Sequence, residues 1–383
     1  MDYPIYLDYN ATTPIDKRVL DTMMPYLTEH FGNAASRSHA YGWKAEEAVS
    51  TARQQIADLL GCSVKEIVFT SGATESINLA LKGFFEMKVS SSHITLERES
   101  HFITLATEHK AVLDTMARLE KLGAEVSYLP VKSDGLVDLE VFKSAFKPNT
   151  ALVSIMWANN EIGVIQPIEQ LAEITHQNGA VFHTDATQAV GKIPIDIQNI
   201  DLLSFSGHKI YAPKGVGVLY VKKNVKLTAQ QDGGRHERGL RSGTLNVPSI
   251  VGLGTACEIA AQESNEESER LRILRDKLEI GITSNIKGTH VNGNLENRLS
   301  HVSNISFEGV DGEMLLMNLN KIAVSNGSAC NSASTEPSYL LKALGHSDDL
   351  AYSSVRFSLG RFTTESDIDL AIAHVKEVIQ KMR

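Results

Sequence analysis

Short runs of β-branched and apolar residues alternate with longer helical stretches over most of the first 260 residues. Such alternation is typical of β-α-β units that wind a largely parallel sheet. The pattern therefore predicts a large α/β domain with helices flanking a mainly parallel seven-stranded sheet. The predicted strands are residues 66–70, 102–107, 125–131, 151–157, 180–184, 202–206 and 217–221.

One helix before the first of these strands is predicted together with its end. Apolar residues between positions 45 and 60 recur every three or four residues, which is the spacing of one face of an α-helix. Gly61 follows directly, and glycine is common at the C-terminal cap of a helix. We therefore expect an amphipathic helix that ends at Gly61.

The pattern changes near residue 263, where a charge-rich helical stretch begins. We expect a smaller α+β domain from this point, formed by residues 263–383 together with residues 1–15, while residues 16–262 form the large domain. The smaller domain would carry a polar loop around Cys330. Its other expected elements are strands at 301–307 and 354–359 and helices at 312–320 and 365–382.

Composition and charge narrow the function classes. The chain has 383 residues, 42% of them hydrophobic, so there is enough apolar material for two cores. Its net charge of -9 is the wrong sign for a protein that binds phosphate backbones directly. No apolar run approaches the roughly 20 residues that span a bilayer, and residues 1–10 lack the pattern of a secretory signal. We expect a cytoplasmic protein that binds neither membranes nor nucleic acid.

The three cysteines are far apart and form no paired spacing, so neither a disulfide framework nor a zinc ribbon fits. A reducing compartment suits such a chain, and the histidines show no spacing that predicts a metal site. Cys62 at a helix end and Cys257 in an apolar run are predicted to be packing residues. Cys330 has small polar neighbours, so we expect an accessible thiol that a nearby base or cation could activate.

Polar residues follow the predicted strands, at the sheet edge where open parallel sheets bind ligands. After the first strand, Gly72 makes a turn into a helix whose N-terminus suits a phosphate. The signatures of nucleoside triphosphate and dinucleotide loops are absent, which favours a phosphate without adenosine. A helix cap that binds nothing is the alternative at this position.

An aspartate and a lysine follow two later strands, at Asp185 and Lys209. A pyridoxal phosphate enzyme needs a lysine that bonds covalently to the cofactor, a carboxylate that keeps the pyridine nitrogen protonated, and a phosphate cup. The chain supplies all three at strand ends. The alternative, a surface ion pair between Asp185 and Lys209, does not explain their polar surroundings.

Two further residues have two interpretations each. His109 follows the second strand and is either a hydrogen-bonded scaffold residue or the base that activates Cys330. Arg356 lies within a strand pattern, where a charge is costly unless it has an anionic partner. That partner is either a substrate carboxylate, held bidentately, or an acidic residue of the protein.

Taken together, seven motifs resemble those of the cysteine desulfurases of the IscS/NifS type, which are class V, fold type I pyridoxal phosphate enzymes. The resemblance covers essentially the whole chain, and the long loop around Cys330 resembles the group I branch. It implies the fold of the pyridoxal-phosphate-dependent transferases. The motifs are YLDYNATTP at 6–14, SGATES at 71–76, NNEIG at 159–163, DATQ at 185–188, SGHK at 206–209, RSGT at 241–244 and GSAC at 327–330.

The resemblance also implies roles for residues around the cofactor. Lys209 would bond to pyridoxal phosphate, Asp185 would pair with its ring nitrogen, and Gln188 would bond its phenolic oxygen. His109 would stack on the ring. The phosphate would be bound by Ala73, Thr74, Ser206 and His208, with Thr244 reaching in from the partner subunit of a homodimer.

Asn160 would contact both cofactor and substrate, while Arg356 and Asn33 would bind the substrate carboxylate. The implied reaction converts L-cysteine to L-alanine and leaves the sulfur on Cys330 as a persulfide. Lys209 and His109 would move the protons. An acceptor protein would then take the sulfur for iron–sulfur cluster assembly, tRNA thiolation or DNA phosphorothioation, three destinations that the sequence leaves open.

Two other functions compete with this hypothesis. Another class V enzyme, such as a transaminase or a selenocysteine lyase, would share the cofactor residues but has no need of Cys330. A non-catalytic platform for sulfur-accepting proteins would have no need of Lys209, Asp185 and Cys330 together. The presence of all three favours desulfuration.

Overall fold

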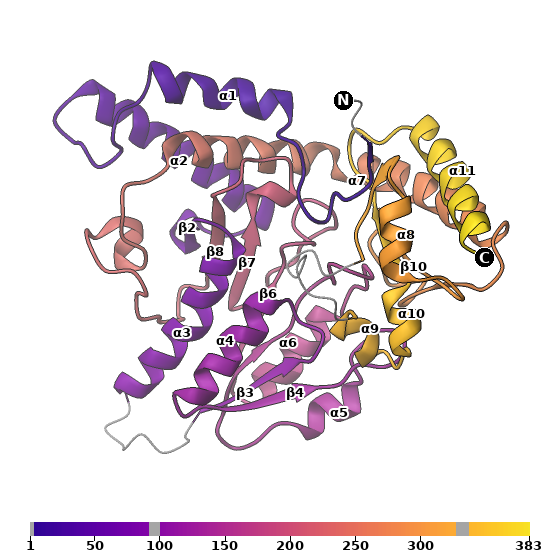
Figure 1. Cartoon of the computed structure of the whole chain (residues 1–383). Coiled ribbons are helices and arrows are strands. Elements are labelled where there is room, and N and C mark those ends of the chain that lie inside the picture. Colours follow the sequence, from indigo (N-terminus) through magenta and orange to yellow (C-terminus); the bar gives the residue numbers. More distant parts are fainter. Residues whose placement is uncertain (1–3, 92–99, 327–336) are drawn as a thin grey trace.

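A seven-stranded sheet forms the centre of the molecule in the computed structural model, which describes residues 4–91, 100–326 and 337–383 (Figure 1). Its strand order is β2-β8-β7-β6-β5-β3-β4. Strand β8 runs antiparallel to both its neighbours, and the other four pairings are parallel. The predicted mainly parallel sheet is confirmed, with each strand end within three residues of its predicted position. The strands are β2 Ile67–Thr70, β3 His101–Leu105, β4 Glu125–Leu129, β5 Thr150–Ser154, β6 Val181–Asp185, β7 Leu202–Ser206 and β8 Gly217–Val221.

Helices cover both faces of this sheet because successive side chains of its strands point to opposite sides. In β8, Val218 and Tyr220 belong to one core, which they share with residues of α1, α2, α6 and α7. Leu219 belongs to a second core, shared with α3 and α4. The helices are α1 Lys17–Thr28, α2 Ala40–Leu60, α3 Ala73–Ser91, α4 Lys110–Lys121, α5 Leu139–Ser144, α6 Ile168–Gln177 and α7 Val247–Thr283.

Helix α2 ends as its sequence predicts. Gly61 has a φ of 68°, in the left-handed region, and its N–H group bonds the carbonyl oxygens of Ala57 and Asp58. Glycine adopts this conformation at little cost, so it satisfies carbonyl groups that the last helical turn would otherwise leave without partners. The helix begins at Ala40, earlier than the first periodic apolar residue.

A second region packs around an antiparallel sheet of order β12-β10-β9 and a two-stranded parallel sheet of β1 and β11. Strand β1 comes from the N-terminus, so this region combines both ends of the chain, and its core runs from Leu7 to Ile379. The elements are β1 Ile5–Tyr6, β9 Thr289–Val291, β10 Val302–Phe307, α8 Gly312–Asn318, β11 Ile322–Ala323, α9 Tyr339–Ala343, α10 Asp348–Tyr352, β12 Ser354–Ser358 and α11 Glu365–Met382.

The proposed domain boundary at residues 262/263 falls inside α7, a single helix of 37 residues. The change of charge in the sequence predicts a new helix near residue 263. The structure has one continuous helix. Its first half packs in the core of the large sheet, where Ile259 lies, and its second half packs in the core of the second region, where Leu271 lies. The change in charge therefore marks a change of surroundings along one helix, and the division into two domains stays a prediction.

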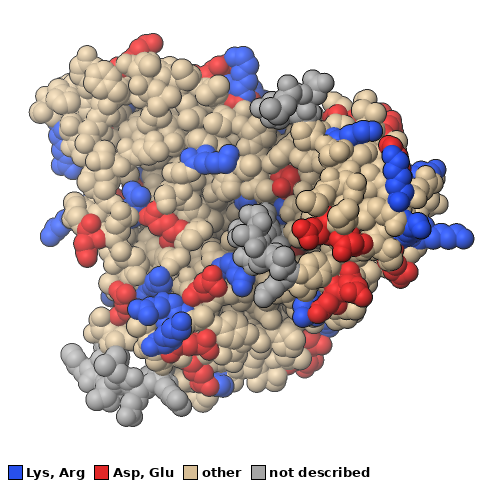
Figure 2. All heavy atoms as spheres, viewed as in Figure 1, with Lys and Arg blue, Asp and Glu red and all other residues tan. Residues whose placement is uncertain are grey.

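Charge on the surface is mixed on the face that Figure 2 shows, where basic and acidic side chains are interspersed among uncharged ones. Among the described residues, no helix is both long enough and apolar enough to cross a bilayer.

Close packing of α2 against α7 gives a test of the fold. A Cβ atom added at the buried Gly254 of α7 would lie 2.6 Å from the Cα atom of Ala52 in α2. We expect Gly254→Ala to lower the free energy of unfolding by about 1–3 kcal/mol, because backbone has to move, and this outweighs the better helix propensity of alanine. Thermal unfolding of the protein without cofactor measures it.

Ser50→Ala, on the exposed side of α2, is the matched control and should melt close to the unsubstituted protein. A Gly254→Ala variant as stable as this control would contradict the close approach of the two helices.

Candidate active site

A cavity of about 550 Å³ opens at the carboxyl ends of β6 and β7, within the size range of sites for small ligands. It is lined by residues from distant parts of the chain, and most residues that the sequence singled out converge on it. These are Ala73, Thr74, His109, Asn160, Asp185, Gln188, Ser206, His208, Lys209 and Arg356.

Lys209 follows β7 in a single 3₁₀ turn, Gly207–Lys209. Its Nζ donates hydrogen bonds to the carbonyl oxygens of Asn10, at 2.6 Å, and Ala11, at 2.7 Å. Next to it, His208 Nδ1 is hydrogen bonded to Thr12 Oγ1 at 3.1 Å. Burial, reinforced by the charge of Lys209, lowers the pKa of His208 to about 4, so this ring is neutral at pH 7.

Asp185 is the last residue of β6 and is only 5% exposed, which rules out a surface ion pair with Lys209. Its Oδ1 accepts a hydrogen bond from the N–H group of Thr187 at 3.0 Å. Two buried atoms of the cavity wall, Thr187 Oγ1 and Arg356 Nε, have no hydrogen-bond partner among the described residues. Since buried polar groups are normally paired, these two atoms indicate a polar ligand.

The N-terminus of α3 forms another part of the wall. The helix begins at Ala73, and the first N–H groups of a helix have no partner within it. Strand β8 supports the turn before the helix, since a Cβ atom at Gly217 would lie 2.5 Å from the Cα atom of Gly72. The side chain of Ser206 lies beside the same turn, because its Oγ is 3.5 Å from the Cβ position of Gly72. This N-terminus suits a phosphate, as predicted.

His109 is anchored as the N-terminal cap of α4. Its Nδ1 accepts the N–H group of Ala111 at 3.1 Å, so a neutral ring carries its proton on Nε2. The ring also lines the cavity. His109 is therefore hydrogen bonded to the scaffold through Nδ1, and a catalytic role, which stays a prediction, would use Nε2.

Arg356, in β12, is 1% exposed and has two partners within the protein. Its Nη2 pairs with Asp8 Oδ1 at 2.6 Å, and its Nη1 donates to the carbonyl oxygen of Asn160 at 2.9 Å. The salt-bridge interpretation is thus confirmed. The unpaired Nε on the cavity wall leaves a substrate carboxylate as a further partner.

Two predicted site residues that the structure describes do not line this cavity, and a third is not described. Asn33 is exposed in the connection between α1 and α2, where its Oδ1 accepts the N–H group of Ala35 at 2.9 Å. Thr244 lies outside the cavity of its own chain, which agrees with its predicted place in a partner subunit but does not test it. Cys330 lies outside the described residues.

The chain on either side of residues 327–336 is attached to the cavity wall. On one side, the carbonyl oxygen of Ser325 accepts the N–H group of Arg356 at 2.6 Å. On the other, Ser338 Oγ donates to Glu161 Oε2 at 2.6 Å, and the hydroxyl of Tyr339 donates to the carbonyl oxygen of Glu108 at 2.5 Å. The described residues on both sides of the segment that carries Cys330 are therefore hydrogen bonded to residues at this cavity.

The other two cysteines are structural. Cys257 is fully buried in the core of the large sheet, and Cys62 packs against the same core. Burial raises the pKa of Cys62 to about 12 and also raises that of Cys257, so neither thiol ionises at neutral pH. Within residues 4–91, 100–326 and 337–383, no three histidine, cysteine, aspartate or glutamate side chains form a group suited to a metal ion.

The sequence did not predict the roles of several residues around the cavity. Asp8 and Asn10 lie in the YLDYNATTP motif, and Glu108 and Thr187 lie beside predicted site residues. Their places in or beside the motifs could have drawn attention to them. Their roles could not be predicted, because each depends on a partner that is remote in sequence or on how deeply the side chain is buried.

Comparison with known proteins agrees with this site. Residues 5–370 match the family described as Aminotransferase class-V. The chain belongs to the class V aminotransferase family. Within this family it is 55% identical to the cysteine desulfurase IscS of Methylobacillus flagellatus, over 99% of this chain and 93% of the relative. It is 54% identical to the IscS of Dechloromonas aromatica, over 100% of this chain and 94% of that relative.

A solved structure of a NifS-like protein superposes on the chain with a TM-score of 0.91 at 39% identity, covering 99% of this chain and all of the other. Class V aminotransferases depend on pyridoxal phosphate, so membership implies this dependence, and the predicted family and fold are confirmed. Identity above 50% over the full chain places it among the cysteine desulfurases of the class.

Glu108 offers a test of the electrostatics of this class V site. Its carboxyl is fully buried, Oε1 accepts the N–H group of Met156, and Oε2 has no partner among the described residues. Burial, with Asp185 nearby, raises the pKa of Glu108 well above its ordinary value. Its folded-state pKa exceeds its unfolded value, so stability is lost as pH rises from the unfolded pKa towards the folded one.

We therefore expect Glu108→Gln, which cannot ionise, to raise the melting temperature at pH 8 and to change it much less near pH 4.5. Thermal melts across this range measure the difference. Glu173→Gln, at an exposed position of α6, is the control and should show no such pH-dependent gain. A Glu108→Gln variant less stable than the unsubstituted protein at pH 8 would mean that Glu108 is ionised in the folded state.

Proposed function

We propose that this protein converts L-cysteine to L-alanine and transfers the sulfur to Cys330 as a persulfide. The observation that carries the proposal is one cavity that joins Lys209, Asp185, His109 and Arg356 with both flanks of the Cys330 segment. A transaminase would need the first residues but no cysteine. The full-length relatives named cysteine desulfurase support the same conclusion.

The residues of the cavity fit pyridoxal phosphate. Lys209 would bond to it, the buried Asp185 would pair with the ring nitrogen, and Gln188 would bond the phenolic oxygen. His109 would lie against the ring. The phosphate would bind at the start of α3 and the neighbouring strand end, on Ala73, Thr74, Ser206 and His208, and Asn160 would contact the cofactor too. When bound, the cofactor withdraws electrons from the substrate, which acidifies the Cα proton and makes the sulfur susceptible to attack.

Substrate binding follows from the fixed position of Arg356. Its guanidinium group is held by Asp8 and the Asn160 carbonyl, so it requires little reorganisation to bind a carboxylate through the remaining N–H groups. We propose that the Asn160 side chain, and Asn33, complete this carboxylate site.

The proton transfers are assigned to two residues. Lys209, once released by the substrate amine, removes the Cα proton as general base. The Asn10 and Ala11 carbonyl oxygens hold its amine beside the cavity. His109 Nε2 exchanges protons with the substrate thiol and with Cys330, since its Nδ1 is occupied by the backbone of α4.

Sulfur transfer forms one bond and breaks another. The Cys330 thiolate bonds to the substrate sulfur, the carbon–sulfur bond breaks, and its electron pair stays on the substrate carbon. That carbon is protonated, Lys209 returns a proton to Cα, and the product leaves as L-alanine, so no external oxidant or reductant is needed. A thiolate of an acceptor protein then takes the outer sulfur from the Cys330 persulfide.

We propose a homodimer whose interface includes α1 and the start of α2, which lie together at one end of the molecule (Figure 1). Large apolar side chains are exposed there, and such surfaces mark interfaces. A second copy would cover them and bring Thr244 to the phosphate site of its partner. The exposed side chains are Leu20, Met24, Leu27, Phe31, Tyr41 and Trp43.

We propose a cytoplasmic location. Cys62 and Cys257 are both unpaired, and the mechanism needs a reduced thiol at Cys330. Reducing compartments maintain thiols in this state.

The sulfur-transfer step is tested by production of L-alanine and sulfide from L-cysteine with a reductant. We expect Cys330→Ala to lose at least about 100-fold in rate, because the nucleophile is gone, while retaining the absorbance of bound pyridoxal phosphate. Cys62→Ala is the control and should keep its rate. A Cys330→Ala variant as active as this control would contradict the persulfide mechanism.

The dimer is tested by Phe31→Glu, which places a charge at a side chain that is 67% exposed in the single chain. We expect this variant to sediment as a monomer, because burying an unpaired charge in the interface is costly, and to bind pyridoxal phosphate more weakly without Thr244 of a partner. Leu370→Glu, at a 57% exposed position on α11, should remain dimeric. Equal sedimentation of the two variants as dimers would exclude this interface.

A further inference from the structure

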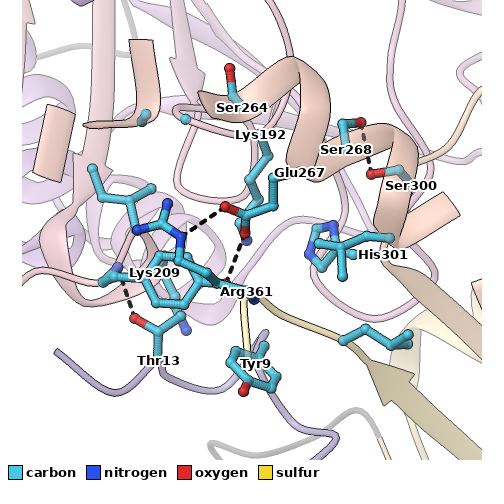
Figure 3. Close-up of a pocket in the computed structure, with 16 residues that line it drawn as sticks. Tyr9, Thr13, Lys192, Lys209, Ser264, Glu267, Ser268, Ser300, His301 and Arg361 are labelled. Carbon is cyan, nitrogen blue, oxygen red and sulfur yellow. Dashed lines mark hydrogen bonds and ion pairs between the residues drawn. The ribbon is translucent and has the colours of Figure 1, made fainter. Parts of the chain in front are cut away.

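Behind Lys209 lies a second, smaller cavity that the proposed reaction does not use (Figure 3). Its volume is about 30 Å³, enough for about two water molecules. Lys209 lines both this cavity and the larger one. The charged or titratable residues around the small cavity include Lys192, Glu267, His301 and Arg361.

Lys192 contacts a residue of the proposed cofactor site. Its Nζ donates a hydrogen bond to Oε1 of Gln188 at 2.5 Å. Gln188 is itself buried and lines the large cavity. Lys192 therefore reaches the wall of the active site from behind, through one buried amide.

The contacts of Gln188 determine the positions of its amide nitrogen and oxygen. Nε2 donates to the carbonyl oxygen of Asn10 at 3.0 Å, while Oε1 accepts from Lys192. An ammonium group can only donate, so a charged Lys192 requires an oxygen opposite it. The second proton of Nε2 is then the amide group that remains for a ligand in the large cavity. The Asn10 carbonyl oxygen and a charged Lys192 favour the same orientation of the amide, and loss of Lys192 leaves the Asn10 contact alone to hold it.

The charged groups around Lys192 act on its protonation in opposite directions. Lys209 and Arg356 disfavour its protonated form, and Glu267 favours it. The carboxylate of Glu267 is shared with other partners, since it pairs with Arg361 at 2.9 Å and accepts the Tyr211 hydroxyl at 3.1 Å.

The imidazole ring of His301 at this cavity carries no charge at neutral pH. His301 is buried, which lowers its pKa well below the ordinary value, and its Nε2 is hydrogen bonded to Asn10 Oδ1. Burial and the charge of Lys209 lower the pKa of Lys192 to about 7. Lys192 is therefore charged below neutral pH and progressively neutral above it. When charged, it disfavours a positive charge on Lys209, because the interaction of two like charges is mutual.

We propose that Lys192 is a positioning residue that orients the Gln188 amide, so that an N–H group faces the phenolic oxygen of pyridoxal phosphate. Its positive charge also disfavours a proton on the nitrogen of Lys209 when that nitrogen is bonded to the cofactor. The inference rests on the proposed function, because it requires pyridoxal phosphate in the large cavity. It assigns a role to a lysine that contacts neither substrate nor cofactor.

The test compares Lys192→Met and Lys192→Arg by two measurements on purified protein. The first is the pH midpoint of the absorbance change of bound pyridoxal phosphate, which reports protonation at the Lys209 nitrogen. Removing a positive charge nearby should raise this midpoint by about 0.5–1 pH unit in Lys192→Met. The second is the dissociation constant of pyridoxal phosphate, which should rise about 2- to 10-fold as one oriented hydrogen bond is lost.

Lys192→Arg keeps a charged donor and should restore both values towards those of the unsubstituted protein. Lys192→Gln keeps a donor without the charge, so the midpoint should still rise while affinity is largely retained; it also serves if the methionine variant does not fold. Lys65→Met is the control. It removes an exposed charge at the start of β2, the end away from the large cavity, and should change neither the midpoint nor the dissociation constant.

An unchanged midpoint in both Lys192→Met and Lys192→Gln would overturn the inference. This result differs from failure of the proposed function, in which the unsubstituted protein itself would not bind pyridoxal phosphate or would not release sulfide from L-cysteine. A lower melting temperature alone, with midpoint and affinity unchanged, would show that Lys192 only supports the fold and would also overturn the inference.

Discussion

The backbone of residues 8–13 ties the two regions of the molecule together at the active site, and the rest of the structure depends on these bonds. The carbonyl oxygen of Asn10 accepts from both Lys209 and Gln188, and that of Ala11 accepts from Lys209 again. The N–H group of Asn10 bonds the Ser358 hydroxyl in the small antiparallel sheet. Because these bonds use backbone atoms, they constrain the path of the segment more than its side chains, and they place the lysine amine between two sheets.

Several buried ionisable groups near the active site are held neutral by burial. His208 has its pKa lowered to about 4 and His183, inside the large sheet, to about 3, while that of Glu108 is raised. Asp185, Lys209 and the Asp8–Arg356 pair are among the charged groups that remain at the site. In a region of low dielectric, a small number of fixed charges acts strongly on a bound ligand.

The sequence was sufficient for the parts that follow local rules. Strand β7 and the cap at Gly61 could be predicted because periodicity and glycine conformation act over a few residues. Lys209 and Asp185 could be predicted because strand ends meet at one edge of a sheet. The pairing of Asp8 with Arg356 joins residues 348 positions apart, and no local pattern indicates it. The role of Lys192 was missed for the same reason, since it depends on the orientation of a neighbouring amide.

The parallel pairing of β1 with β11 has a consequence for biosynthesis. Ile5 pairs with Ile322, and Asn10 finds its partner on Ser358 only when most of the chain has been made. During translation, the nascent chain can form its large sheet while its first residues remain without these partners. Until then, the segment that supplies the carbonyl groups for Lys209 has only its contacts with the large region, such as that of Thr13 with His208. Its attachment to the small antiparallel sheet is therefore one of the last contacts that the growing chain can form.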